Sequence, residues 1–208
     1  MNKQVEKLPM LSQRYEALGD GIFAVAATIL ILDIHLPEGG GFESNAAFFH
    51  FLKEVMPNVV CYFTSFTVLG IMWFGHRAMF EYIERTNRYF IFLGFIFYAL
   101  ICFVPFSTKL LAFDPLSWYG ILIYGINLSL CNLSLYVQWY YGINRPGLMG
   151  RKMNDDIRKQ ARFLFLLSPV VYTVAIALAF WFPAISLVIF VVTPILYLLP
   201  NQLDKYLH

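Results

Sequence analysis

Charged side chains are scarce in this sequence. Of its 208 residues only 13% are charged, 59% are hydrophobic, and the net charge is +2. A soluble domain usually carries about 25% charged residues, so the composition is typical of a membrane protein. The mean hydropathy of +0.63 points the same way. So small a net charge gives no reason to expect nucleic acid as a partner.

Cysteines and catalytic motifs are also few. Cys61, Cys102 and Cys131 all fall inside apolar runs, where cysteines usually act as small hydrophobic residues. The sequence has no phosphate-binding Walker loop, no His-Glu-x-x-His zinc motif, no arginine-rich voltage sensor and no Thr-Val-Gly-Tyr-Gly potassium filter. The first 14 residues are polar, so no cleaved signal peptide is expected. We expect neither an enzyme nor a resident cofactor or metal, and no soluble protein partner is evident.

Long apolar runs are what the sequence does contain. A transmembrane helix needs roughly 20 mostly apolar residues. Residues 163–203 carry no charge, and this run is about twice as long as one crossing, so we divide it at Trp181-Phe182-Pro183. The sequence therefore predicts an all-α membrane protein with a single domain, residues 1–208, and six spans at 15–36, 55–76, 88–112, 116–142, 163–182 and 184–201. The longest loops, 37–53 and 143–162, are too short for a folded soluble domain.

The basic residues predict the orientation of these spans. With the N-terminus inside, thirteen of the fifteen Lys and Arg residues fall on one side, and only Lys53 and Lys109 fall on the other. Basic residues favour the cytoplasmic side of a membrane. We therefore expect a multi-pass protein of the cell membrane with both termini in the cytoplasm.

The first predicted span differs from the others because it carries acidic groups. At 100° per residue, one of its faces begins with an arginine and is otherwise apolar apart from a single hydroxyl. That face comprises Arg14, Leu18, Gly21, Val25, Thr28, Ile29 and Leu32. It suits either ordinary contact with lipid and neighbouring helices or the lining of a pore, and the pattern alone does not choose between them.

A second face of the same helix combines small residues with one carboxylate, and comprises Ala17, Asp20, Ala24, Ala27 and Ile31. Small residues allow close approach of another helix in lipid, and a carboxylate there needs a partner. We expect this face to pack on a neighbouring helix with Asp20 paired to an Arg or His. Trp73 and His76, three residues apart, mark the inner end of the second span. His76 is expected to act in structural pairing, with proton transfer or helix capping as alternatives.

Three segments together resemble the transmembrane protein 175 family, whose best-known member is a lysosomal potassium channel. The first resembles the family's Arg-x-x-x-Phe-Ser-Asp signature, and the other two follow in order at similar spacing. They are Arg14-x-x-x-Leu18-Gly19-Asp20, Trp73-Phe74-Gly75-His76-Arg77 and Val104-Pro105-Phe106-Ser107-Thr108. From its sequence alone, Pro105 is expected to kink or end the third helix.

The resemblance implies a potassium-permeable cation channel, a homotetramer with six helices per subunit and an architecture unlike that of ordinary potassium channels. The first helix of each subunit would line the pore in the lipid bilayer, with potassium as the permeating ion. The implied constriction is Val25, Thr28, Ile29 and Leu32, and the implied polar network that holds the helices is Arg14, Asp20, Trp73 and His76.

The chain departs from the family pattern at two places in the first helix. Leu18-Gly19 replaces Phe-Ser, which removes one hydroxyl from the network, and Val25 is shorter than the usual isoleucine or leucine. The alternative function is a proton-coupled or small-solute transporter that uses Asp20 and His76 as a relay.

Overall fold

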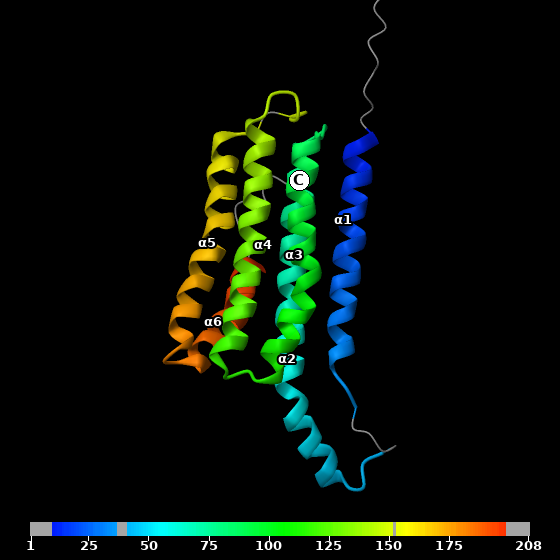
Figure 1. Cartoon of the computed structure of the whole chain (residues 1–208), viewed down its shortest axis with the longest axis vertical. Helices are drawn as coiled ribbons and strands as arrows, with labels where there is room; N and C mark the ends of the chain where they lie inside the picture. The colour runs from blue at the N-terminus through cyan, green and yellow to red at the C-terminus, as the bar shows by residue number, and fades with distance from the viewer. Residues whose placement is uncertain (1–9, 37–40, 152, 199–208) are drawn as a thin grey trace, which may run out of the picture.

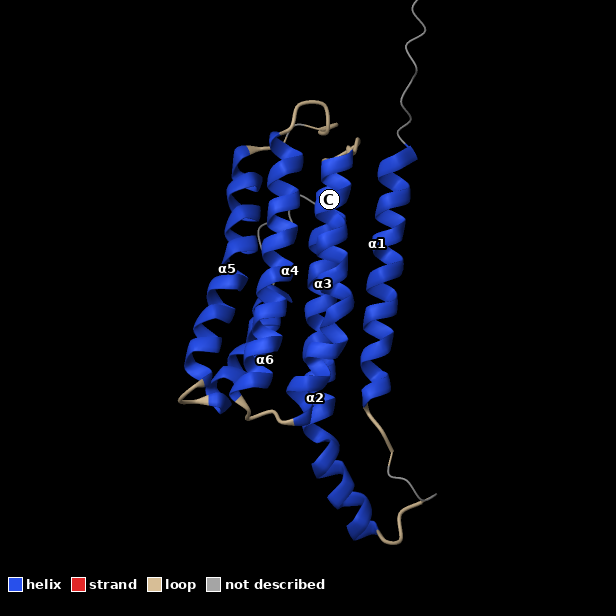
Figure 2. Ribbon diagram, viewed as in Figure 1, coloured by secondary structure: helices blue, strands red, loops and turns tan. Residues whose placement is uncertain are grey.

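The computed structural model describes residues 10–36, 41–151 and 153–198. In these residues the chain forms six α-helices and one short 3₁₀-helix, with no β-strand (Figures 1 and 2). The elements are α1 (Met10–Ile29), η1 (Leu30–Asp33), α2 (Asn45–Phe80), α3 (Arg88–Phe113), α4 (Trp118–Asn144), α5 (Asp155–Ala179) and α6 (Pro183–Leu198). The all-α, six-helix fold expected from the sequence is confirmed.

Polar residues define where the helices begin. Ser44, Asn87, Ser117 and Asn154 precede α2, α3, α4 and α5, and the side chain of each accepts a hydrogen bond from a backbone N–H of the first turn. Such caps satisfy donors that have no partner within the helix. Pro183 begins α6, because the first helical position needs no backbone N–H. The turn predicted at residues 181–183 is therefore confirmed.

The helices run alternately up and down beside one another (Figure 1). Helix α3 packs on α4, and α4 packs on α5, which also contacts α6. Helix α1 lies at one edge of the bundle, where it packs against α2 and α3 (Figure 1). This edge position leaves much of α1 without a neighbour among the described residues.

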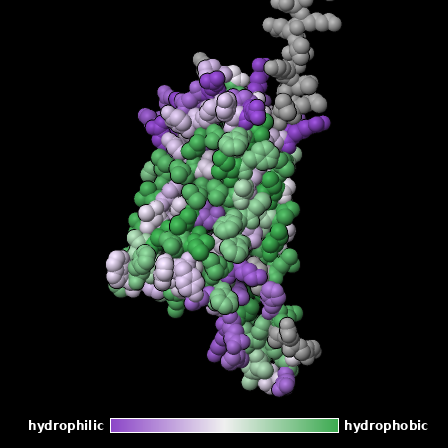
Figure 3. Space-filling view, in the orientation of Figure 1, coloured by the Kyte–Doolittle hydropathy of each residue, from purple (hydrophilic) through white to green (hydrophobic). Residues whose placement is uncertain are grey.

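Five of the described helices, α1 to α5, are long and apolar enough to cross a membrane. Hydrophobic side chains cover the middle of the visible surface, and hydrophilic ones gather at the end that carries the α4–α5 loop (Figure 3). Helix α6 has 16 described residues, or about 24 Å at 1.5 Å per residue, which is shorter than a hydrocarbon core of about 30 Å. The last three residues of its expected span, 199–201, lie outside the described residues.

Helix α2 is longer than the predicted span. It has 36 residues, begins ten residues before the expected residue 55 and ends four after residue 76. Residues 45–53 were expected in a loop but form helical turns that extend past the other helices (Figure 1). The cap at Ser44 and the aromatic contacts of Phe48 with Phe42 and Phe49 account for this extension. Similarly, residues 155–162 begin α5 and are not part of a loop.

Pro105 does not end the third helix. Helix α3 continues through it to Phe113, and Pro105 is buried. A proline lacks the backbone N–H that would bond the residue four positions earlier, here Ile101, yet the helix continues on both sides of it. Ser107 donates a hydrogen bond to the carbonyl oxygen of Val104, 3.0 Å away. Termination at Pro105 is therefore excluded.

Candidate functional site

One face of α1 packs inside the bundle, and it is neither of the two faces singled out in the sequence. The buried residues follow one another at spacings of three and four: Tyr15, Gly19, Phe23, Ala26 and Leu30. Phe23 contacts His76 and Phe97, with ring centroids 6.0 and 5.8 Å apart. Aromatic side chains bury more apolar area than alanines do, which explains why this face, and not the alanine face, is the packed one.

The predicted pore face is open in the single chain. Val25 is 57% exposed, Ile29 is 42% exposed and Leu32 is 68% exposed. Helix α1 changes to the 3₁₀ form at Leu30, and side chains three residues apart overlie one another in a 3₁₀ turn. The change affects the segment that carries Leu32 and begins directly after Ile29. The structure therefore leaves an apolar stripe on α1 that the described residues of the same chain leave largely uncovered.

Thr28 lies beside this stripe and has a local partner. Its hydroxyl donates to the backbone oxygen of Val25 at 2.9 Å. A hydroxyl bonded in this way keeps its oxygen lone pairs free to face a cation or water. Thr28 thus places an exposed hydroxyl next to Val25.

Most of the small-residue face is exposed in the described part of the chain, and only Asp20 and the half-buried Ala27 contact its neighbours, contrary to the close packing expected. Ala17, Asp20, Ala24 and Ile31 are exposed, and Ala27 is half-buried. Because α1 lies at the edge of the bundle, α2 and α3 cover mainly the face that carries Tyr15, Phe23 and Leu30. Much of two adjoining faces of α1 is therefore exposed in the described part of the single chain.

Asp20 has a hydrogen-bond partner, but not an Arg or His. The indole Nε1–H of Trp73 donates to Asp20 Oδ1 at 2.7 Å, which joins α1 to α2. The guanidinium carbon of Arg77 lies 5.7 Å from the centre of the Trp73 ring, close enough for a cation–π contact. Arg14 is exposed, and within the described part of the chain it makes no hydrogen bond or ion pair. The structure thus joins Asp20 directly to Trp73 and places Arg14 apart from them.

His76 is fully buried in an aromatic environment. Its ring is stacked on Phe97 with centroids 5.7 Å apart, and it meets Phe80 edge-on at 5.0 Å. Its Nε2 atom lies 3.0 Å from the hydroxyl of Tyr98 on α3. The side chain is 0% exposed, so the histidine makes a structural pair, as expected, but with Tyr98 in place of Asp20.

Three residues that the sequence reasoning missed complete this region. The Tyr98 hydroxyl donates to the backbone oxygen of Tyr15 at 3.2 Å. Gln138 Nε2 lies 3.2 Å from the Tyr15 hydroxyl and 3.3 Å from the oxygen of Phe90. A glutamine inside a charge-free span is a signal that could have drawn attention, because polar groups in lipid need partners. No comparable signal marks Tyr15 or Tyr98 among the thirteen tyrosines.

The third motif supplies polar links at the opposite end of the bundle. Thr108 donates to Ser65 Oγ at 2.8 Å, and that atom lies 2.9 Å from the Tyr124 hydroxyl. Asn127 donates to Ser107 Oγ at 3.1 Å. These buried bonds join α2, α3 and α4, so the motif stabilises the bundle and does not face the open side of α1.

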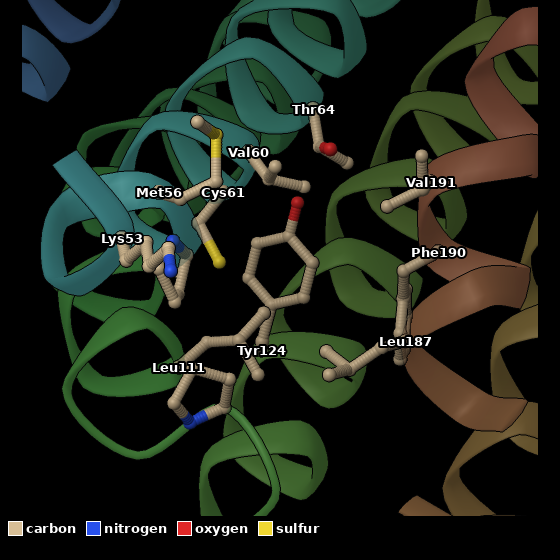
Figure 4. Close-up of a pocket in the computed structure, with 12 residues that line it drawn as sticks. Lys53, Met56, Val60, Cys61, Thr64, Leu111, Tyr124, Leu187, Phe190 and Val191 are labelled. Atoms are coloured by element: carbon tan, nitrogen blue, oxygen red, sulfur yellow. The ribbon is translucent and has the colours of Figure 1, made fainter. Parts of the chain in front are cut away.

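A cavity of about 450 Å³ lies between α2, α4 and α6 (Figure 4). Its walls are mainly apolar, with Lys53 and Thr64 among the few polar side chains, and Leu187 and Phe190 come from α6. No residue of α1 lines it. In addition, the described residues hold no group of three His, Cys, Asp or Glu side chains able to bind a metal. This cavity is therefore separate from the open face of α1.

The fold and this open face define a multi-pass, all-α membrane protein whose first helix is only partly covered by its own chain. The chain belongs to the family described as endosomal/lysosomal potassium channel TMEM175, whose sequence pattern matches residues 14–105. The family resemblance identified in the sequence is thus confirmed.

Bacterial relatives support this membership along most of the chain. The chain is 31% identical over 173 residues to a potassium channel of Streptomyces collinus, which covers 81% of this chain and 82% of that one. It is 32% identical over 175 residues to a potassium channel of Chamaesiphon minutus, with 80% and 83% covered. The crystal structure of a lysosomal potassium-selective channel TMEM175 homolog from Chamaesiphon minutus matches with a TM-score of 0.74 at 29% identity, over 89% of this chain and 95% of that chain.

Vertebrate relatives match a shorter part. The endosomal/lysosomal proton channel TMEM175 of Gallus gallus is 34% identical over 107 residues, which are 49% of this chain and 21% of that protein. The shared part lies within a much longer vertebrate protein.

Proposed function

We propose that this protein is a potassium-permeable cation channel, a homotetramer in which α1 of each subunit lines the pore. Val25, Ile29 and Leu32 form the hydrophobic constriction, and Thr28 lies beside them. The observation that carries the proposal is the uncovered apolar stripe on α1, next to the exposed carboxylate of Asp20. The family description is that of an ion channel and not of an enzyme.

The position of Asp20 supports an assembly in which copies of the chain meet at α1. Asp20 lies eight residues after Ser12, where the apolar segment begins, which is about 12 Å along the helix. A carboxylate at that depth is strongly unfavourable against lipid. Protein or water must therefore cover this side of α1. A single α1 offers only one wall, so a pore along it requires several subunits.

The apolar stripe suits a narrow pore because rings of branched aliphatic side chains can exclude water and so act as a gate. Four copies of Val25, Ile29 and Leu32 would stack as successive rings along the axis. Asp20, bonded to Trp73, holds α1 against α2 at the inner end of these rings. We propose that Arg14, Asp20, Trp73 and His76 support the pore helix without contacting the permeating ion.

We further propose that both termini face the cytoplasm of a cell-membrane protein. Nine of the eleven described Lys and Arg residues lie at the end of the bundle that holds the α4–α5 loop. Basic residues concentrate on the cytoplasmic side. Reporter fusions at residues 85 and 150 should give cytoplasmic signals, and a fusion at residue 115 should give an external one.

The pore assignment is tested by potassium flux in liposomes that contain the purified protein. Val25→Ser and Leu32→Ser should change the flux and the ratio of potassium to sodium permeability, because a polar ring wets the constriction. Val170→Ser on α5 is the matched control, since Val170 is 61% exposed and Val25 is 57% exposed. Unchanged flux in both α1 variants would show that α1 does not line the pore.

The alternative, a proton-coupled or small-solute transporter, needs a relay between Asp20 and His76. Here His76 is fully buried and bonds Tyr98, while Asp20 bonds Trp73. These separate partners favour the channel. Single-channel recording distinguishes the two, because a transporter gives no unitary currents and its flux saturates with substrate concentration.

A further inference from the structure

Tyr98 makes the hydrogen bonds that connect α1 with the buried histidine of α2. We propose that Tyr98 is a positioning residue of the channel: its hydroxyl sets the depth and rotation of α1 and selects the tautomer of His76. The expected effect on ion flux rests on the proposed channel function. The expected effect on His76 does not depend on it.

The protons of this contact can be assigned. The Tyr98 hydroxyl has one proton, and its bond to the backbone oxygen of Tyr15 uses it, because a carbonyl oxygen can only accept. The 3.0 Å contact between Tyr98 and His76 Nε2 then requires the histidine to donate. His76 Nδ1 is buried and has no partner among the described residues. The network therefore holds a neutral His76 with its proton on Nε2.

The space for this hydroxyl comes from a glycine. A Cβ atom added at Gly19 would lie 2.6 Å from the Tyr98 oxygen and 2.8 Å from His76 Cε1. Side-chain atoms essentially never approach a Cβ so closely. Gly19 stands where the family signature has serine. In this chain a hydroxyl still reaches His76 from that place, but Tyr98 of α3 supplies it.

Tyr15 of α1 fixes the position of this helix against both α3 and α4. Its ring is stacked on Tyr98 with centroids 5.2 Å apart, and its own hydroxyl bonds Gln138 of α4. One residue of α1 is thus held by side chains from two helices. A shift of α1 by one residue would rotate Tyr15 by about 100° and break both bonds. These two hydrogen bonds therefore also fix the rotation of α1, and with it the direction in which Val25 and Leu32 point relative to the proposed pore axis.

The experiment compares Tyr98→Phe with Tyr124→Phe in the full-length protein reconstituted in liposomes. Both variants remove a buried, bonded tyrosine hydroxyl, but Tyr124 lies on α4 and bonds Ser65, away from α1. Per assembled channel, Tyr98→Phe should lower potassium flux at least about fivefold, the factor that one net hydrogen bond represents. Tyr124→Phe should leave the flux per channel unchanged. Equal flux in the two variants would overturn the proposal.

A rescue separates the hydroxyl from mere packing. In the Tyr98→Phe background, Gly19→Ser returns a hydroxyl to His76 from the α1 side, whereas Gly19→Ala adds only bulk. In both double variants the added Cβ displaces His76, whose Cε1 lies 2.8 Å from it, so the difference between serine and alanine reports the hydroxyl. The serine double variant should recover flux relative to Tyr98→Phe, and the alanine double variant should not. Equal recovery with alanine would show that volume and not the hydrogen bond matters, and would contradict the assignment.

Nitrogen-15 NMR of labelled histidine provides a readout that needs no channel activity. Wild-type His76 should show the Nε2–H tautomer, and Tyr98→Phe should change its nitrogen shifts. A wild-type Nδ1–H tautomer would refute the proposal even if the variants failed to assemble. If the wild-type protein carried no ion flux while His76 behaved as expected, the channel function would fail and the role of Tyr98 in positioning α1 would stand.

Discussion

Gly94 on α3 offers a direct test of how tightly α1 is held. A Cβ atom at this position would overlap the Tyr15 hydroxyl and lie 2.5 Å from Gln138 Nε2. Tyr15 is 5% exposed and packs against four aromatic rings, so it has little room to move. Gly94→Ala should therefore displace Tyr15 and break its bond to Gln138.

The size of this effect follows from three contributions. Overpacking of a dense core destabilises by about 1–3 kcal/mol. Loss of the hydrogen bond between Tyr15 and Gln138 adds about 1 kcal/mol. Replacement of a helical glycine by alanine contributes about 1 kcal/mol in the opposite direction. Gly94→Ala should thus lower the free energy of unfolding by about 1–3 kcal/mol.

Detergent-solubilised protein unfolded with increasing SDS and followed by tryptophan fluorescence measures this difference. Gly70→Ala is the control, because a Cβ there meets nothing within 4 Å, and it should be neutral or slightly stabilising. Tyr15→Phe combined with Gly94→Ala should recover part of the loss, since the overlapping oxygen is gone. If Gly94→Ala were as stable as Gly70→Ala, the close packing of Tyr15 against α3 would be refuted.

Three further predictions concern one hydrogen bond and the exposure of individual side chains. Trp73→Phe removes the indole N–H that donates to Asp20 and should lower the free energy of unfolding by about 1.5–3 kcal/mol, the range for hydrogen bonds to charged groups. The same SDS unfolding assay measures this change. An unchanged midpoint would mean that the 2.7 Å contact is not made. Leu32→Ala should change stability by no more than about 0.5 kcal/mol, since the side chain is 68% exposed, yet alter ion permeability; a large loss of stability with normal permeability would contradict its position. Cys102 is exposed and Cys131 is buried, so a membrane-permeant maleimide should label Cys102 much faster than Cys131. Mass spectrometry of the labelled peptides measures the two rates, and faster labelling of Cys131 would contradict the structure.

Much of the architecture followed from hydropathy and helical periodicity. Runs of apolar residues of the length of a bilayer crossing predicted the helices, although α5 begins at Asp155, eight residues before its expected start. Helix ends were less predictable, as α2 shows, because the cap at Ser44 extends a helix past the apolar segment. Periodicity also grouped Val25, Ile29 and Leu32 on one face of α1, and the structure leaves these three side chains exposed together. Their role in a pore remains a prediction.

What the amino-acid sequence by itself determined is a membrane protein of six helices with an unusual first helix and the family motifs. The choice of partners depended on tertiary structure. Spacing along one helix says which residues share a face, but not which neighbour meets that face or at what height. Only the packed bundle brings Trp73 to Asp20 and Tyr98 to His76, because these pairs depend on the relative positions of three separate helices.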